Sequence, residues 1–307
     1  MTAFKISEID GVIAAQVTPF DEDGKVDLGR TRTITRFLME RGLQGLYLTG
    51  STGEGFMMSP DERKAVVETV VEEVNGALPI IVHVGAISTF HSVDLAKHAA
   101  SVGADAISSV PPIYWSFSPD QVYGYYADIT VSTDLPMIAY NVPLAAMGFD
   151  LIARLATIEG VEGVKYTATT HADILRIKEE IGADFRVYSG ADEMAMSGLA
   201  FGADGIIGSF YNVMPEVFLK LYAAMKSGDL AEAKALQETA NAVIFHALKN
   251  NPMSAMKRMM AWQGADAGLC RKPFDNFDAA GEAALKESFR KLRDVRGLSG
   301  VNFLDTL

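Results

Sequence analysis

The sequence has little of what disulfide-linked, membrane-spanning or nucleic-acid-binding proteins are built from. Cys270 is the only cysteine among 307 residues, which excludes an internal disulfide and favours a reducing compartment, so we expect a cytoplasmic protein. No apolar run reaches the ~18 residues of a membrane span, and Met1–Lys5 lacks the apolar core of a secretory signal. Positive charge is scarce: 27 Lys and Arg against 39 Asp and Glu give −12, which disfavours nucleic acid and anionic membranes as partners.

Several signatures of cofactor and nucleophile chemistry are also missing. The glycine-rich sequence at residues 50–55 is not followed by the Lys-Ser/Thr of a nucleotide-binding P-loop, and neither a Gly-x-Gly-x-x-Gly fingerprint nor a Gly-x-Ser-x-Gly elbow occurs. The five histidines have no metal-ligand spacing. We therefore expect no metal and no cofactor, and we interpret Cys270 as a small buried residue and not as a nucleophile.

Short apolar runs alternate with longer amphipathic ones over the first 226 residues. Eight such alternations predict an α/β fold with a parallel sheet, and the even spacing favours a (β/α)8 barrel over an open sheet. The strand signal then stops, and residues 227–307 predict a helical extension packed on the barrel. The expected strands are Gly11–Thr18, Gly45–Leu48, Ile80–Val84, Ala106–Val110, Met137–Tyr140, Val161–Tyr166, Arg186–Ser189 and Gly205–Gly208. The expected helices are Leu28–Glu40, Asp61–Val74, Ser92–Val102, Pro119–Ser132, Phe149–Thr157, Ala172–Ile181, Glu193–Phe201, Pro215–Met225, Leu230–Lys249, Pro252–Gln263 and Ala279–Val295.

Polar and ionisable residues follow many of these strands, and the active site of such a barrel lies at the carboxyl ends of its strands. Lys165 is the most informative of them, because the apolar run Val161–Tyr166 carries it toward the barrel interior. Desolvation lowers the pKa of a buried lysine, and a neutral amine can attack a ketone to form a Schiff base. The alternative from spacing alone is a strand-end lysine that reaches solvent.

Two further segments are candidates for the same site. The turn Gly50–Gly55 combines glycines that permit close backbone approach with the hydroxyls of Ser51 and Thr52, which suits a small anion such as a carboxylate. Tyr140, at the end of an apolar strand, carries a phenol that can move a proton. The alternatives are an ordinary connecting turn and a packed aromatic ring.

Together these segments resemble the pyruvate-dependent Schiff-base enzymes of the N-acetylneuraminate lyase and dihydrodipicolinate synthase superfamily. The likeness covers almost the whole chain and includes GVIAAQVTPF (11–20), GSTGEG (50–55), YNVP (140–143), Lys165, GADE (190–193) and GSFYN (208–212), in that order.

The resemblance implies a function for each matching residue. Lys165 would condense with the ketone of a 2-oxo acid, and Ser51 and Thr52 would hold its carboxylate. Tyr140 would relay protons with Ser51 and with Tyr114 from a neighbouring subunit of a homotetramer. A polyhydroxylated tail would be bound by Thr167, Gly190, Asp192, Glu193 and Ser209.

Within the superfamily, the residues favour a lyase that splits a 2-oxo sugar acid similar to N-acetylneuraminate into pyruvate and an aldehyde. Ala145 stands where the synthases resembling this chain carry an arginine, and Ser51 and the Asp192–Glu193 pair are closer to the lyases. The short apolar stretch Leu144–Phe149 and Trp115, where a tyrosine is expected, point the other way.

Three alternatives therefore stay open. One is a dihydrodipicolinate synthase-like enzyme and another is an aldolase or dehydratase of 2-keto-3-deoxy sugar acids, both using the same lysine. The third is a non-catalytic barrel that senses small carboxylates. For Asp192 and Glu193, helix capping without ligand contact is the alternative to hydroxyl binding.

Overall fold

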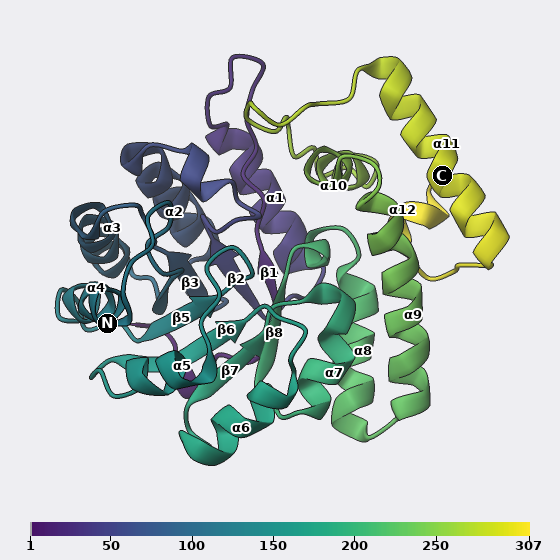
Figure 1. Cartoon of the computed structure of the whole chain (residues 1–307). Coiled ribbons are helices and arrows are strands. Elements are labelled where there is room, and N and C mark those ends of the chain that lie inside the picture. Colours follow the sequence, from purple (N-terminus) through teal and green to yellow (C-terminus); the bar gives the residue numbers. More distant parts are fainter. Residues whose placement is uncertain (1) are drawn as a thin grey trace.

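The computed structural model describes residues 2–307, and its centre is a closed barrel of eight parallel strands. Each strand pairs with its neighbours in chain order, and β1 pairs with β8 to close the ring (Figure 1). This confirms the predicted (β/α)8 barrel. The strands are β1 (Gly11–Ala15), β2 (Gly45–Leu48), β3 (Ile80–His83), β4 (Ala106–Ser109), β5 (Met137–Asn141), β6 (Val161–Tyr166), β7 (Arg186–Ser189) and β8 (Gly205–Gly208).

Helices follow the strands and form the outer layer. Ser59 with Glu62 and Ser118 with Gln121 make the reciprocal bonds of two capping boxes, which start α2 and α4. The barrel helices are α1 (Leu28–Glu40), α2 (Pro60–Val74), α3 (Thr89–Val102), α4 (Pro119–Thr130), α5 (Phe149–Leu155), α6 (Ala172–Glu180), α7 (Ala195–Ala200) and α8 (Pro215–Ser227). Single turns of 3-10 helix lie at Ile6–Glu8, Gly55–Met57, Asp192–Met194 and Phe210–Asn212.

Most predicted boundaries agree with the structure to within two residues, and three elements differ for reasons that the contacts explain. β1 ends at Ala15 and not at Thr18, because the chain then leaves the sheet, and Phe20 pairs with Val26 and Leu269. Helix α3 begins at Thr89 because Ser88 caps it. The expected helix Glu193–Phe201 is a 3-10 turn followed by the short α7, and the side chain of Gln237 bonds to the backbone of both pieces.

Two apolar layers hold the barrel together. The inner layer fills the ring of strands with side chains such as Ile13, Tyr47, Ile138 and Tyr188. The outer layer lies between the strands and the helices and continues into the C-terminal helices. Because side chains alternate along a strand, the inner layer fixes which residues at the strand ends face the barrel mouth.

The C-terminal part of the chain contains four further helices: α9 (Leu230–Ala247), α10 (Pro252–Ala261), α11 (Ala279–Arg296) and α12 (Asn302–Asp305). Helix α9 lies along α8, and α11 lies at the edge of the molecule farthest from the barrel (Figure 1). Phe289, Phe303 and Leu304 are fully buried, so these helices pack as one body with the barrel. No helix in the described part of the chain is long and apolar enough to cross a bilayer.

Candidate active site

Lys165 points into the mouth of the barrel and is buried. It lies in β6, in register with Tyr140 of β5 and Tyr188 of β7, and only 4% of it is exposed. Its Nζ lies 4.3 Å from the centre of the Tyr140 ring and 4.4 Å from that of Tyr47. Within residues 2–307, no carboxylate pairs with this amine. Burial excludes the alternative of a solvent-reaching lysine and leaves the amine beside the predicted phenol.

Thr167 and Gly190 directly follow β6 and β7 and lie next to this lysine. A Cβ at Gly190 would collide with Oγ1 of Thr167 and would lie 3.1 Å from Cε of Lys165, so a glycine is needed there. Oγ1 of Thr167 is buried and has no hydrogen-bond partner among the described residues. Because buried hydroxyls are normally bonded, this oxygen is available to a ligand that occupies the barrel mouth.

The turn after β2 presents backbone amides to the same region. Glu54 N–H donates to the carbonyl of Ser51, and Gly55 N–H donates to that of Gly50, which closes the turn. In the described chain, the N–H groups of Ser51, Thr52 and Gly53 have no protein acceptor. Consecutive free amides of this kind form a concave site for a small anion.

The hydroxyls of this turn differ in their surroundings. Ser51 is exposed, and its side chain makes no hydrogen bond with any residue from 2 to 307. Thr52 is buried, and its Oγ1 lies 2.7 Å from Oγ of Ser209, which follows β8. The structure therefore brings together one residue predicted to bind the carboxylate and one predicted to bind the tail.

Asp192 is buried after β7, and its Oδ2 accepts a 2.7 Å hydrogen bond from the N–H of Phe210. A Cβ at Gly208 would collide with its other oxygen, so the close approach of β8 depends on that glycine. Burial raises the pKa of Asp192 to about 7, against the opposing effects of the Phe210 hydrogen bond and the Lys165 charge. Glu193 is half-buried, and its carbonyl accepts from Asn241. Neither side chain makes a capping hydrogen bond to the helix that follows, although both acidic residues lie in the first turn of Asp192–Met194.

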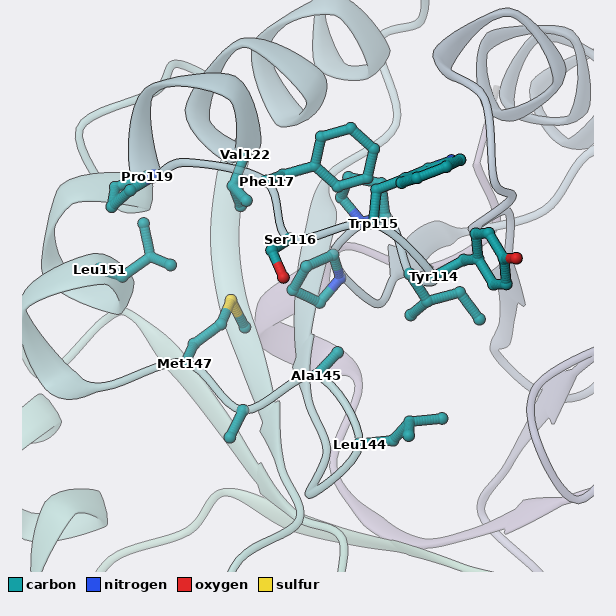
Figure 2. Close-up of a pocket in the computed structure, with 14 residues that line it drawn as sticks. Tyr114, Trp115, Ser116, Phe117, Pro119, Val122, Leu144, Ala145, Met147 and Leu151 are labelled. Carbon is teal, nitrogen blue, oxygen red and sulfur yellow. The ribbon is translucent and has the colours of Figure 1, made fainter.

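Tyr114 differs from most of the other predicted site residues because its side chain is largely exposed. It is 83% exposed, and its ring packs edge-on against Trp115 at 5.1 Å. Tyr114 lines an apolar groove of about 650 Å³. Met147 and Leu151 lie on the other side of this groove, and the Tyr114 hydroxyl points away from them (Figure 2). Residues 111–117 and 144–147 supply most of the walls of this groove. Met147 N–H donates to Oδ1 of Asn141, so the groove begins immediately after Tyr140.

Sequence reasoning missed the aromatic floor of the site. Tyr47 lies under Lys165 and its hydroxyl lies 3.1 Å from Ser108, while His83 packs edge-on against Tyr140 at 6.1 Å. Burial, with the nearby cations of Arg63 and Lys165, holds the pKa of His83 well below its ordinary value. A tyrosine and a histidine in otherwise apolar strands were the available signal.

No cluster in residues 2–307 offers three or more histidine, cysteine, aspartate or glutamate side chains that could hold a metal ion. Cys270 is buried, and burial raises the pKa of its thiol to about 11. Its thiol is therefore protonated at neutral pH and a poor nucleophile, as predicted.

A closed barrel with a buried, unpaired lysine beside a phenol and a turn of free amides defines a class of enzymes in which an amine reacts with a carbonyl substrate. Residues 8–292 match the model of the dihydrodipicolinate synthetase family, and the chain belongs to this family. It is 38% identical over 296 residues to an N-acetylneuraminate lyase of Escherichia coli, covering 95% of this chain and 99% of the relative.

Solved structures agree with this assignment. CdNal from Clostridium difficile in complex with mannosamine has a TM-score of 0.89 at 32% identity, covering 92% of this chain and 99% of that one. A catalytic lysine mutant of the Ruminococcus gnavus sialic acid aldolase has a TM-score of 0.90 at 30% identity, covering 97% and 99%. The predicted resemblance is thereby confirmed.

Proposed function

We propose that this chain is a Schiff-base aldolase that cleaves a 2-oxo sugar acid of the N-acetylneuraminate type into pyruvate and an aldehyde. The observation that carries the proposal is the amine of Lys165, which is buried without a carboxylate partner and lies 4.3 Å from the Tyr140 ring. The names of the relatives support the same reaction: one is a sialic acid aldolase with a catalytic lysine, and another is an N-acetylneuraminate lyase.

Lys165 and Tyr140 divide the chemistry between them. The neutral amine adds to the C2 ketone, and the Tyr140 hydroxyl gives its proton to the departing water, which leaves an iminium ion on Lys165 and a phenolate on Tyr140. The Tyr140 phenolate takes the proton of the C4 hydroxyl, the C3–C4 bond breaks, and its electron pair moves into the iminium to give an enamine and an aldehyde. Proton return to C3 and hydrolysis by water then release pyruvate and restore the amine.

The remaining predicted residues bind and orient the substrate. The free amides of residues 51–53 and the hydroxyls of Ser51 and Thr52 hold the carboxylate next to the ketone. The tail lies along the part of the rim that follows β6, β7 and β8, where Thr167, Asp192 and Ser209 offer a free hydroxyl, a carboxyl and a second hydroxyl. Gly190 leaves space for the tail, and Glu193 adds a half-buried carboxylate.

Borohydride trapping tests the chemistry directly. Pyruvate with borohydride is expected to fix a stable adduct on Lys165, detected by mass spectrometry of the peptide that contains it. Lys165→Ala is expected to lose both the adduct and pyruvate release from N-acetylneuraminate. Full turnover by this variant contradicts the mechanism, and turnover of any 2-oxo acid by the native chain excludes the alternative of a non-catalytic sensor.

A second candidate is the same lysine chemistry on a 2-oxo acid with a less polar tail, by an aldolase, a dehydratase or a dihydrodipicolinate synthase-like enzyme. The groove beyond Tyr140 favours it, because Trp115, Leu144 and Met147 give it an apolar surface. Ala145 weighs against the synthase, since it offers no cation for a second carboxylate. Pyruvate release from N-acetylneuraminate, compared with turnover of 2-keto-3-deoxy sugar acids, separates the candidates: activity only on the latter rejects the first.

We also propose a cytoplasmic homotetramer in which Tyr114 acts in the site of a neighbouring subunit. The exposed ring of Tyr114 on the rim supports its action in a neighbouring subunit, and the protonated, buried thiol of Cys270 supports a cytoplasmic location. Subunit mixing tests the first: Tyr114→Ala and Lys165→Ala are each expected to be impaired, and a mixed oligomer to regain activity. Such an oligomer joins an intact lysine to an intact tyrosine from the partner, and absence of recovery contradicts the exchange.

A further inference from the structure

An ion pair behind the amide turn joins it to the C-terminal helices. Lys257 of α10 is 1% exposed, and its Nζ donates to Oε1 of Glu54 at 2.7 Å, and to the carbonyls of Thr18 and Leu269 at 2.6 Å each. The three protons of the ammonium group are therefore all used. The two charged residues are 203 positions apart in the chain, and neither belongs to the predicted site.

Glu54 is held from two directions. Its Oε2 accepts a 2.8 Å hydrogen bond from the N–H of Arg271, in the segment after α10. Its backbone has φ 53° and ψ 33°, the left-handed conformation that is unfavourable for a residue with a Cβ. A conformation of this kind persists only where the surroundings fix it, and here α10 and the segment around Arg271 fix it through the side chain.

The interactions of Lys257 extend to the turn that carries the free amides. The hydroxyl of Thr18 donates to the carbonyl of Gly53 at 2.8 Å, while the carbonyl of Thr18 accepts from Lys257. The peptide between Gly53 and Glu54 is thus held at its oxygen and at the following side chain. The N–H of this peptide donates to the carbonyl of Ser51, so its orientation is coupled to the rest of the turn that carries the N–H groups of Ser51, Thr52 and Gly53.

We propose that Lys257 and Glu54 are positioning residues for the carboxylate site, so that the C-terminal helices take part in 2-oxo acid binding. This rests on the proposed function, in which the turn binds the substrate carboxylate. Lys257 contacts no reacting atom. It acts through Glu54, whose side chain keeps the turn in the conformation that presents three amides to one anion.

The experiment measures pyruvate binding apart from stability. Borohydride trapping at a series of pyruvate concentrations gives the half-saturation concentration and the maximal trapping rate of the full-length protein, well below each variant's melting temperature. The variants are Lys257→Met, the milder Glu54→Gln and the double variant. Arg293→Met is the matched control, because the Arg293 side chain also donates a hydrogen bond to a backbone carbonyl, that of Leu304, but makes no contact with the turn.

For Lys257→Met we expect a half-saturation concentration about tenfold higher, equal to ~1.4 kcal/mol, with a maximal trapping rate within about threefold of the native rate. Glu54→Gln is expected to change in the same direction by less, and the double variant to be no worse than Lys257→Met. Arg293→Met is expected to melt earlier with unchanged half-saturation.

The outcomes separate the two levels of the argument. If the native chain traps no pyruvate, the proposed function fails and this inference fails with it. If the native chain traps pyruvate and both single variants keep its half-saturation concentration while melting earlier, the ion pair only stabilises the fold and the inference alone is overturned. If Lys257→Met does not fold, Glu54→Gln decides between these results.

Discussion

The barrel mouth and the region behind the amide turn each contain a buried lysine, in opposite surroundings. The ammonium group of Lys257 donates three hydrogen bonds, one to a carboxylate and two to carbonyls. Lys165 has two aromatic rings near its amine and no carboxylate partner within residues 2–307. An ammonium group is costly to bury unless it is paired, and only the Lys257 amine has a carboxylate and two carbonyls to offset that cost. Both lysines are buried, so the partners of the two amines, and not their burial, distinguish them.

Replacement of Lys165, the lysine that we propose to be reactive, is expected to have the largest effect. Lys165→Met is expected to lower pyruvate release by roughly 10⁴-fold or more, because the covalent route is lost as a whole. Its free energy of unfolding is expected to stay equal or to rise, since an unpaired buried amine is replaced by an apolar chain of similar length. Initial rates and urea denaturation measure the two quantities. A marked loss of stability would show that this amine has a partner after all.

Replacement of Lys257 is expected to lower the free energy of unfolding, in contrast to replacement of Lys165. Lys257→Met leaves the carboxyl group of Glu54 buried without its cation, and removal of one partner of a buried ion pair typically costs about 3–5 kcal/mol of stability. Urea denaturation at pH 7 measures the loss, with Arg293→Met as the control for a cation removed from the same part of the chain. A stability change below about 1 kcal/mol would contradict the assignment, because it is the range of a solvent-exposed pair.

The contrast between these lysines also marks what the sequence could reveal. Lys165 was predictable because it ends an apolar strand and a barrel gathers its strand ends at one rim. Lys257 was not, although it lies between Met256 and Met259 on the buried face of α10, because its partner is 203 residues away. A charge in an apolar helical pattern indicates that a partner exists but does not name it.

The fold followed the same division between local and distant causes. Strand positions and the two capping boxes depend on neighbouring residues, and the sequence predicted them to within a few positions. The break between Asp192–Met194 and α7 involves Gln237 of α9, and the end of β1 involves Leu269. Contacts of this length are set by packing of the whole chain, which residue patterns do not encode locally.

Asp192, on the side of Lys165, sharpens the comparison through the dependence of stability on pH. Its pKa is raised to about 7 by burial, whereas an unfolded aspartate titrates near ~3.9. The folded state therefore keeps a proton that the unfolded state has lost, and stability falls as the pH rises from about 4 to about 7, by up to ~4 kcal/mol from this group. Asp192→Asn is expected to flatten that part of the pH–stability curve, measured by urea denaturation. An unchanged slope would show that the carboxyl ionises normally.

The smallest expected effect concerns the bond that joins the two sides of the barrel mouth. Ser209→Ala removes the 2.7 Å contact with Oγ1 of Thr52, on the turn that Lys257 supports. A single hydrogen bond of this kind contributes about 1 kcal/mol, so we expect a several-fold rise in the KM for the intact substrate. Half-saturation in pyruvate trapping reports the carboxylate side alone. If the half-saturation concentration for pyruvate rises as much as the KM, Ser209 acts on the carboxylate through Thr52. If the half-saturation concentration does not change, Ser209 acts on the tail. The two assays together therefore assign this hydroxyl to one side of the site.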